Sequence, residues 1–261
     1  MMEKAKIVIN IKKPEAKKFL AQTRTLLRAN GFIISAKPDF VIAVGGDGTM
    51  LHAAHLYGKK GIPILGVNSG GLGFLTDVTF DRLFNTLKEI KNKKFIFEKR
   101  MMIQAKFNKN TLNALNDLTI ITRIPGRAVE FSATINKEYI CRFIADGIII
   151  ATPTGSTAYS LATSGPILLP DTEAIIVTPI APHTLSVRPI VLPSNSIVEI
   201  KVGAKGKAAL VADGQRSKSV RNGQVIKFKK APYYVKLIKP RHTTFFHTLR
   251  EKMKWGGRED A

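Results

Sequence analysis

The apolar positions of the first hundred residues alternate between two patterns. Continuous apolar runs are typical of strands covered on both faces, and apolar residues at helical spacing predict amphipathic helices. The expected strands occupy residues 5–9, 39–44 and 62–67. The expected helices occupy residues 14–30, 50–57 and 81–91. Strands that alternate with helices in this way predict a mainly parallel, doubly wound α/β sheet.

After Lys94 the pattern changes to short strands separated by turn residues such as Pro125-Gly126 and Asn222-Gly223, which predicts a β-rich second domain. Its expected strands occupy residues 95–97, 101–107, 114–122, 128–135, 147–151, 174–178, 197–202, 208–212 and 233–238. We therefore expect an α/β domain over residues 1–95 and a β-rich domain over residues 96–242. A C-terminal helix within residues 243–261 is expected to join the first domain.

Composition places the chain among folded globular proteins. The chain has 261 residues, of which 44% are hydrophobic and 23% charged, so disorder and collagen-like repetition are excluded. No apolar run approaches the roughly 18 residues that a membrane-spanning helix needs, which favours a cytoplasmic protein with no membrane partner. The single cysteine, Cys141, excludes an intrachain disulfide and a thiolate metal site.

The net charge of +22 is the first indication of function, because a basic surface attracts polyanions. The basic residues are spread along the chain and do not form a tail. Phosphorylated small ligands, nucleic acid and simple solubility all agree with such a distribution.

The segment Gly-Gly-Asp-Gly-Thr at residues 45–49 lies between an expected strand and an expected helix. Backbone N–H groups and the helix dipole favour an anion at such a junction, and glycines leave room for a phosphate. The carboxylate of Asp47 would repel that phosphate unless it binds magnesium or receives a proton from a hydroxyl. The alternative interpretation is a tight Asp-Gly turn that Thr49 caps.

A second polar loop, Asn-Ser-Gly-Gly-Leu-Gly-Phe at residues 68–74, follows the next expected strand. The carboxyl ends of neighbouring parallel strands meet at one edge of a sheet, so we expect both loops to line one crevice. Phe74 would then flank a base, or else fill the space beneath the loop as a hydrophobic plug.

A third segment begins at Asp146-Gly147 and runs through a strand into Thr-Pro-Thr-Gly-Ser-Thr-Ala-Tyr-Ser at residues 152–160. Its hydroxyl groups and Gly155 precede an expected helix and offer small donors to a polar ligand. A helix cap is the alternative, but a cap uses only one or two of these hydroxyl groups.

Several other chemistries lack their motifs. The sequence contains no Gly-x-x-x-x-Gly-Lys-Ser/Thr loop and no Gly-x-Gly-x-x-Gly after the first strand, so a Walker-type loop and the ordinary dinucleotide fingerprint are excluded. It also contains no Gly-x-Ser-x-Gly, which argues against a serine hydrolase. His52 and His55 have the spacing of a helical metal pair, but no matching ligand lies nearby in sequence, so we expect no metal ligand among the side chains.

Together these segments resemble the NAD kinases, which phosphorylate the adenosine 2′-hydroxyl of NAD. The Gly-Gly-Asp-Gly-Thr loop is shared with phosphofructokinase-like and lipid kinases, whereas residues 154–159, preceded by Asp146-Gly147, are far more selective for this family. Asn116-Asp117, residues 183–189 and Asp213-Gly214-Gln215 follow in the order and approximate spacing of the family.

The resemblance implies a phosphofructokinase-like α/β domain, a β-sandwich-like domain and NAD bound in a cleft. It implies ATP or inorganic polyphosphate as phosphoryl donor, a divalent metal ion (Mg²⁺) as cofactor, and assembly as a homo-oligomer, either a dimer or a tetramer. Neither nucleic acid nor a membrane is an expected partner.

The resemblance also implies roles for individual residues. Asp47 would act as general base or orienter of the 2′-hydroxyl, and Gly46 and Gly48 would approach the phosphates. Asp146 would reach the nicotinamide end, with a neighbouring subunit as one source of that contact. The remaining implied contacts to the dinucleotide are His52, Phe74, Asn116, Asp117, Arg127, Thr157, Ala158, Tyr159 and Gln215. The family usually has Asn-Glu at the position of Asn116-Asp117, so the shorter Asp117 needs a small backbone shift to reach a ribose hydroxyl.

Two rival functions have support in the sequence. A lipid kinase would share the Gly-Gly-Asp-Gly-Thr loop, but the chain shows no apolar stretch suited to a bilayer-derived substrate. A nucleic-acid-binding module would explain residues 228–250, where aromatic residues interleave with Lys and Arg. A strand and a helix whose aromatic side chains face a core explain that segment better.

Overall fold

The computed structural model describes residues 2–12, 14–71, 73–124, 126–203, 207–240 and 244–255. The chain divides into two compact units. The first unit comprises residues 1–99 and 234–261, and the second comprises residues 100–233. The first unit is therefore built from both ends of the chain, and the second unit is inserted between them.

The first unit contains a parallel sheet. Its elements are β1 (Lys4–Ile9), α1 (Ala16–Ala29), β2 (Ile33–Ile34), β3 (Phe40–Val44), α2 (Asp47–Tyr57), a 3-10 turn (Gly58–Lys60), β4 (Ile64–Asn68), β5 (Val78–Thr79), a second 3-10 turn (Phe80–Arg82), α3 (Leu83–Lys91) and α5 (Phe245–Met253). The strand order is β4-β3-β1-β2, with every pair parallel. The last residues of β17 (Val225–Lys239) run parallel to β4 on its other side, with Leu237 opposite Ile64.

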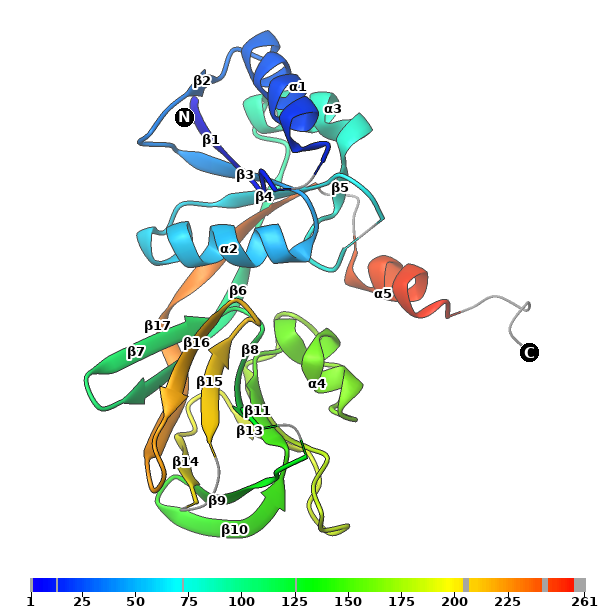
Figure 1. Ribbon diagram of the computed structural model, residues 1–261. Helices are drawn as coiled ribbons and strands as arrows, with labels where there is room; N and C mark the ends of the chain where they lie inside the picture. Colours follow the sequence, from blue (N-terminus) through cyan, green and yellow to red (C-terminus); the bar gives the residue numbers. More distant parts are fainter. Residues whose placement is uncertain are drawn as a thin grey trace. The chain divides into compact units, whose positions relative to one another are not determined.

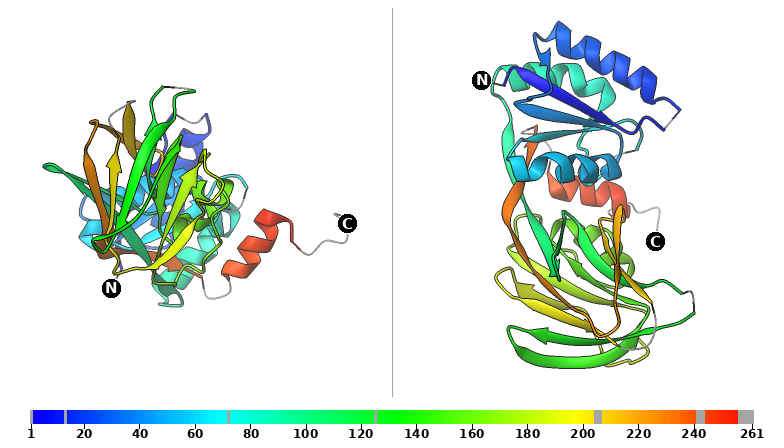
Figure 2. Two further views of the ribbon diagram at one scale, coloured as in Figure 1. Left: turned by 90° about the horizontal axis from the view of Figure 1, so that it is seen from below. Right: turned by 60° about the vertical axis from the view of Figure 1, so that its left-hand side comes forward.

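Helices cover both faces of this sheet. Figure 1 shows α1 and α3 on one face and α2 on the other, and the right-hand view of Figure 2 agrees. All five residues of β3 are buried, as a continuous apolar run predicts for a strand covered on both faces. Leu27 of α1 and Leu83 and Leu87 of α3 pack in one cluster with Phe40 of β3. Each such fully buried side chain contributes roughly 1.5–3 kcal/mol to stability.

The second unit is built almost entirely from strands. Its elements are β6 (Ile96–Phe107), which begins in the first unit, β7 (Asn110–Ala114), β8 (Asp117–Thr122), β9 (Val129–Ile135), β10 (Glu138–Ala145), β11 (Gly147–Ala151), a 3-10 turn (Thr154–Thr157), α4 (Tyr159–Ala162), β12 (Ala174–Ile180), β13 (Ile190–Pro193), β14 (Val198–Val202), β15 (Ala208–Ala212), β16 (Arg216–Val220) and the first part of β17. One antiparallel sheet has the order β13-β12-β11-β8-β15-β16. In the other, β10, β9, β14 and β17 are antiparallel neighbours.

The predicted fold class is confirmed: a parallel α/β portion and a β-rich portion. Five strands, β2, β5, β10, β13 and β16, lie where the sequence predicted none, and β7 overlaps an expected strand only at Ala114. β10 and β16 expose most of their side chains, so the apolar alternation that predicts a half-buried strand is weak there. The segments expected at residues 95–97 and 101–107 form the single strand β6, because the charged residues between them continue the strand.

Two helix boundaries also differ from expectation. Helix α2 begins at Asp47, three residues before the expected start, with Gly46 as its N-cap residue. The helix expected after residue 158 is only four residues long. Of the C-terminal helix expected within residues 243–261, residues 245–253 form α5, residues 254 and 255 lie beyond its end, and residues 243 and 256–261 lie outside the described residues. No helix among the described residues is both long enough and apolar enough to cross a lipid bilayer.

Candidate functional site

In the first unit, the Gly-Gly-Asp-Gly-Thr segment forms a very short junction between β3 and α2. Only Gly45 and Gly46 lie between the strand and the helix, and Asp47 is the first helical residue. The N–H groups of a first helical turn have no partner within the helix, and the helix dipole adds partial positive charge there. The junction is therefore suited to an anionic ligand.

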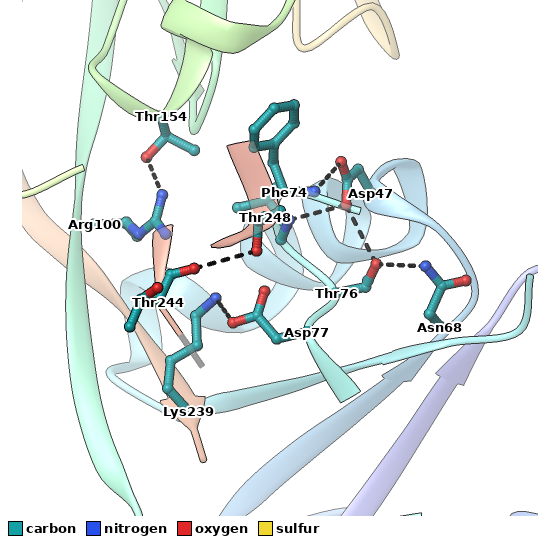
Figure 3. A network of polar contacts seen from close by, with 11 residues as sticks. Asp47, Asn68, Phe74, Thr76, Asp77, Arg100, Thr154, Lys239, Thr244 and Thr248 are labelled. Atoms are coloured by element: carbon teal, nitrogen blue, oxygen red, sulfur yellow. Dashed lines mark hydrogen bonds and ion pairs between the residues drawn. The ribbon is translucent and has the colours of Figure 1, made fainter. Parts of the chain in front are cut away.

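The carboxylate of Asp47 is held by the loop after β4, as Figure 3 shows. The backbone N–H of Phe74 donates to Oδ2 over 3.0 Å, and the N–H of Leu75 donates to Oδ1 over 3.0 Å. The hydroxyl of Thr76 also donates to Oδ1, at the longer distance of 3.5 Å. Because a carboxylate oxygen can accept two hydrogen bonds, these contacts orient the group and leave Oδ2 with acceptor capacity.

This loop approaches Asp47 closely only because residue 73 is glycine. A Cβ atom at Gly73 would overlap Oδ1 of Asp47 and Oγ1 of Thr76. The side-chain amide of Asn68 holds the loop from its other side: it donates to Oγ1 of Thr76 over 3.1 Å and to the carbonyl of Gly71. Asn68 and Thr76 are both buried, so this small network lies inside the unit.

The two glycine-rich loops line one cavity, as their positions at the carboxyl ends of neighbouring strands predicted. The cavity has a volume of about 440 Å³. Gly45 and Gly46 line it together with residues 68–71. Its other wall is largely apolar and comes from the end of β1 and the start of α1. The remaining described lining residues are Ile9, Asn10, Pro14, Glu15, Ala16, Phe19 and Val44.

The other site residues predicted in the first unit lie around the same junction. Gly48 and His52 are exposed on α2, as is His55. Phe74 is partly buried, and its ring lies 6.3 Å from the ring of Phe245 in α5. The described residues contain no group of three His, Cys, Asp or Glu side chains that could hold a metal ion.

In the second unit, the hydroxyl-rich segment packs against the segment between β7 and β8. The Thr152 hydroxyl donates to the carbonyl of Leu115 over 2.5 Å, and the Thr152 N–H donates to the carbonyl of Asn116 over 2.9 Å. Gly155 faces the same stretch, where a Cβ atom would overlap the carbonyl of Asn116. The glycine in this motif therefore permits close backbone approach.

A carboxylate holds the opposite side of this stretch. Oδ2 of Asp213 accepts the N–H of Leu115 over 3.0 Å, and Oδ1 accepts the N–H groups of Asn116 and Asp117 over 2.8 and 3.3 Å. Asp213 lies in the turn between β15 and β16. Burial raises the pKa of Asp213, whereas the three N–H bonds and the charge of Arg216 act in the opposite direction.

Asp117 carries an unusual charge environment. Its side chain is buried, and it accepts a 3.0 Å hydrogen bond from the Thr119 hydroxyl. Burial, together with the negative charge of Asp213, raises the pKa of Asp117 to about 6, although the hydrogen bond from Thr119 lowers it. Perturbed carboxylates of this kind are enriched in functional sites.

Four of the predicted residues in the second unit line a second cavity, with a volume of about 360 Å³. They are Asn116, Asp117, Ala158 and Tyr159. The other lining residues are Thr119, Ile121, Val211, Asp213 and Gly214. Tyr159 is 41% exposed. Among the described residues, Oδ1 of Asn116 is a buried acceptor without a hydrogen-bond partner, which is costly unless a ligand supplies a donor.

The remaining predicted residues are not among the described lining residues of this cavity. The Thr157 hydroxyl donates to the carbonyl of Thr154 at 3.4 Å. Arg127 and Gln215 are exposed, and Asp146 is partly buried at the junction of β10 and β11. The structure thus brings together the Asn116 and Tyr159 segments, whereas Arg127 lies in a separate loop between β8 and β9.

Sequence reasoning did not assign roles to Asp213, Thr76 or Asn68 as supporting residues. The sequence identifies Asp213 only as part of the family segment Asp213-Gly214-Gln215, and an Asp-Gly pair does not by itself reveal which backbone groups its carboxylate accepts. Asn68 is predicted only as the first residue of the polar loop at residues 68–74, and Thr76 lies just after that loop. The fold alone brings these side chains to their partners.

Family models match most of the chain. The model described as the ATP-NAD kinase N-terminal domain matches residues 3–95, and that of the ATP-NAD kinase C-terminal domain matches residues 115–240. An NAD kinase of Caldanaerobacter subterraneus is 42% identical over 226 residues, which cover 84% of this chain and 80% of that protein. An NAD kinase of Geobacter sp. (strain M21) is 40% identical over 232 residues, covering 86% and 81%.

Solved structures show the same fold. The crystal structure of an NAD kinase from Archaeoglobus fulgidus in complex with ATP has a TM-score of 0.83 and 25% identity, and covers 97% of this chain and 100% of that one. Yeast NADH kinase complexed with NADH has a TM-score of 0.90, with 98% and 88% coverage. At 22% identity, the second comparison concerns the fold alone.

Proposed function

The chain belongs to the NAD kinase family, and from this premise we propose that it transfers the terminal phosphoryl group of ATP to the adenosine 2′-hydroxyl of NAD, giving NADP. The observation that carries the proposal is the carboxylate of Asp47, which two backbone N–H groups orient at the start of a helix. A ribose hydroxyl is a poor nucleophile near neutral pH, so the reaction needs alignment, a proton acceptor and neutralisation of charge.

Asp47 is proposed to accept the hydrogen bond, and then the proton, of the 2′-hydroxyl. The N–H groups of Phe74 and Leu75 use one acceptor position on each oxygen and leave a second position on Oδ2. Because both bonds come from the backbone of one loop, the carboxylate cannot turn without losing them together. The 2′-hydroxyl therefore meets an acceptor whose direction is already set.

The donor phosphates are proposed to bind in the cavity of the first unit. Gly46 adds no side chain there, and a Cβ atom at this position would meet nothing within 4 Å, so a ligand can approach the backbone. The adjacent first turn of α2, which includes Gly48, offers the positive end of the helix dipole. The apolar wall formed by Ile9 and Phe19 suits the nucleoside part of the donor.

A divalent cation is proposed to bind together with the donor. Mg²⁺ is usually held by one or two carboxylates and by the phosphates of a nucleotide, so it needs no cluster of protein ligands. Glu15 lines the same cavity and is exposed, which makes its carboxylate a suitable oxygen donor. The ion would offset the negative charge of the transferred group.

The adenosine of NAD is proposed to contact the cavity of the second unit. The buried Oδ1 of Asn116 needs a donor, which an adenine amine or a ribose hydroxyl supplies. The half-exposed ring of Tyr159 offers a flat apolar surface, and Ala158 leaves space beside it. Asp117 lies on the same wall and is proposed to accept from a ribose hydroxyl.

Five further contacts rest on resemblance and on position. Thr157 adjoins Ala158 at the start of α4, and His52 lies on the exposed side of α2, so both are proposed to contact the dinucleotide. Asp146 is proposed to reach the nicotinamide end. Arg127 and Gln215 are exposed and are proposed as outer contacts.

The proposal is tested by incubating the purified protein with NAD, ATP and magnesium chloride. NADP is then measured with a dehydrogenase that accepts NADP and not NAD. Parallel reactions replace ATP with inorganic polyphosphate or NAD with NADH. The protein is also tested for lipid kinase activity with diacylglycerol as the acceptor. We expect NADP to form with ATP. Phosphorylation of the lipid in the absence of NADP formation would overturn the proposal.

We also propose that the protein assembles as a homo-oligomer. Edge strand β10 exposes Tyr139, Ile140 and Ile144, at 62%, 45% and 45%. Leu185, at 85% exposure, lies in the loop between β12 and β13, whose His183 N–H donates to the carbonyl of Ile144 over 2.9 Å. Light scattering after gel filtration should give the mass of a dimer or a tetramer, and Ile144→Glu should lower that mass. A monomeric wild-type protein would refute this proposal.

A further inference from the structure

The loop segment that holds Asp47 is anchored at its far end as well. Residues 73–77 lie in no helix or strand, so regular backbone pairing does not fix them. At one end, the N–H groups of Phe74 and Leu75 bind the Asp47 carboxylate. At the other end, the carboxylate of Asp77 forms an ion pair with the ammonium group of Lys239. Figure 3 shows both anchors on this short segment.

The Asp77–Lys239 pair is almost completely buried. The two side chains are 9% and 8% exposed. Lys239 is the last residue of β17, two residues beyond Leu237, which pairs with Ile64 of β4. The pair therefore joins the loop to a strand of the parallel sheet across 162 residues of sequence.

Its burial distinguishes this pair from the surface ion pairs. Lys227, on the same strand, pairs with Glu199 at 3.1 Å, with side chains that are 46% and 31% exposed. An exposed pair contributes little, because water screens both charges. A buried pair often gives no more net stability than apolar side chains of similar volume, yet it fixes the geometry of its partners. Stability alone is therefore a weak reason for two buried charges at this position.

We propose that Asp77 and Lys239 are positioning residues for Asp47: their ion pair holds segment 73–77 so that the amides of Phe74 and Leu75 keep the carboxylate aligned. The inference rests on the proposed function, because it assumes that Asp47 accepts the proton of the 2′-hydroxyl. Neither Asp77 nor Lys239 needs to contact a substrate. A misplacement of about 1 Å at a reacting group can lower the rate roughly a hundredfold, so a loose loop would slow the reaction without preventing binding.

The test replaces the ion pair with apolar side chains. Removing one charge leaves the other buried and unpaired, and such a variant can fail to fold. The double variant Asp77→Leu/Lys239→Met avoids this problem, and Lys239→Arg keeps the charge. Lys227→Met is the matched control, since it removes an exposed ion pair from the same strand. Each variant is assayed for kcat, for KM of NAD and ATP, and for melting temperature.

We expect the double variant to melt near the wild-type temperature, to lose about ten- to a hundredfold in kcat and to keep both KM values within about twofold. Lys239→Arg should keep kcat within about threefold, and Lys227→Met should match the wild type. Hydrogen exchange of the peptide that contains residues 73–77 should accelerate in the double variant alone. Wild-type kcat in a folded double variant would overturn the proposal. Unchanged hydrogen exchange of residues 73–77, or a rise in KM with kcat unchanged, would overturn it as well.

A second variant and the order of the assays separate failure of this proposal from failure of the proposed function. If the double variant does not fold, Asp77→Asn/Lys239→Met, which removes both charges and keeps the shape of the Asp77 side chain, is subjected to the same measurements and the same criteria. The wild-type assay is run first, because absence of NADP formation would refute the proposed function. The exchange measurement does not depend on catalysis, so it would still report whether the ion pair holds the loop.

Discussion

Each unit contains a carboxylate that holds successive backbone N–H groups of a distant segment, and the two carboxylates differ in their surroundings. Asp47 accepts two such groups, from residues 27 and 28 positions later. Asp213 accepts three, from residues 96 to 98 positions earlier. Asp47 begins a helix beside a glycine-rich cavity. Asp213 lies near a second buried carboxylate, Asp117, and near Arg216.

The difference shows that hydrogen bonds from successive backbone N–H groups do not by themselves identify a catalytic carboxylate. Asp213 lines the cavity of the second unit. Both of its carboxylate oxygens accept backbone N–H groups, which fixes the stretch that contains Asn116. Asp47 uses the same kind of bonds and retains acceptor capacity at the start of α2. We therefore expect Asp213 to support binding and Asp47 to support turnover, and the following predictions separate those roles.

The largest effect is expected for Asp47→Asn. An amide cannot accept the proton of the 2′-hydroxyl, so kcat should fall by about two to four powers of ten while NAD still binds. The measurement is steady-state NADP formation with NAD affinity from calorimetry. Asp39→Asn is the matched control, because Asp39 accepts the N–H groups of Glu3 and Lys4 at the other end of the sheet. Unchanged turnover in Asp47→Asn would exclude the proposed role.

A smaller effect of a different kind is expected for Asp213→Asn. The amide group of Asn offers one acceptor oxygen and turns a donor toward N–H groups that Asp213 now satisfies, so the Asn116 stretch should loosen. We expect KM for NAD to rise roughly tenfold or more, with a smaller loss of kcat at saturating NAD. A loss of kcat as large as that of Asp47→Asn, with KM unchanged, would contradict the division of roles.

The pH dependence of stability tests the environment of Asp117. Because folding raises the pKa of this carboxyl from 3.8 to about 6, its neutral form is favoured in the folded state. The stability that neutral Asp117 contributes to the folded state is fully present below the unfolded-state pKa of 3.8. It is lost as the pH rises through the folded-state pKa of about 6. The loss amounts to roughly 3 kcal/mol.

Asp117→Asn should therefore melt near the wild-type temperature at pH 4, close to the unfolded pKa, and several degrees above it at pH 8. Thermal unfolding is followed by circular dichroism at both pH values without NAD. A difference between variant and wild type that does not change with pH would show that Asp117 is not held in its neutral form.

The smallest effect is expected for Tyr159→Ala. Tyr159 lines the cavity of the second unit but is 41% exposed, so loss of its ring removes only part of a stacking surface. We expect KM for NAD to rise roughly three- to tenfold with kcat and melting temperature nearly unchanged. Tyr159→Phe, which keeps the ring, should remain within about twofold of the wild type. An equal loss in both variants would assign the contact to the hydroxyl instead.

The sequence predicts well those features that depend on local pattern. The apolar run of β3 and the glycines after it place the Asp47 junction at the carboxyl end of a buried strand. The same argument predicts that the Asn68 loop lines a common cavity. The hydroxyl-rich segment before α4 likewise indicates a site that needs small side chains and close backbone approach.

The partners of the carboxylates could not be predicted, because they depend on tertiary contacts. Nothing near Asp47 indicates that its bonds come from Phe74, and nothing near Asp77 indicates Lys239. Charged residues also conceal buried strand positions: Arg100 is 3% exposed within β6, and its guanidinium donates to the Thr154 hydroxyl over 3.2 Å. A polar residue in an expected gap can therefore belong to the interior.

The construction of the first unit from both chain ends has a consequence for synthesis. Residues 1–99 leave the ribosome first, but β4 gains its β17 neighbour only when residues 237 and 238 emerge. Until then, the nascent sheet has an open edge and Asp77 has no ammonium partner, a state that favours chaperone binding. If the ion pair aligns Asp47, a newly made molecule first becomes competent for turnover only after Lys239 has been synthesised and has reached Asp77.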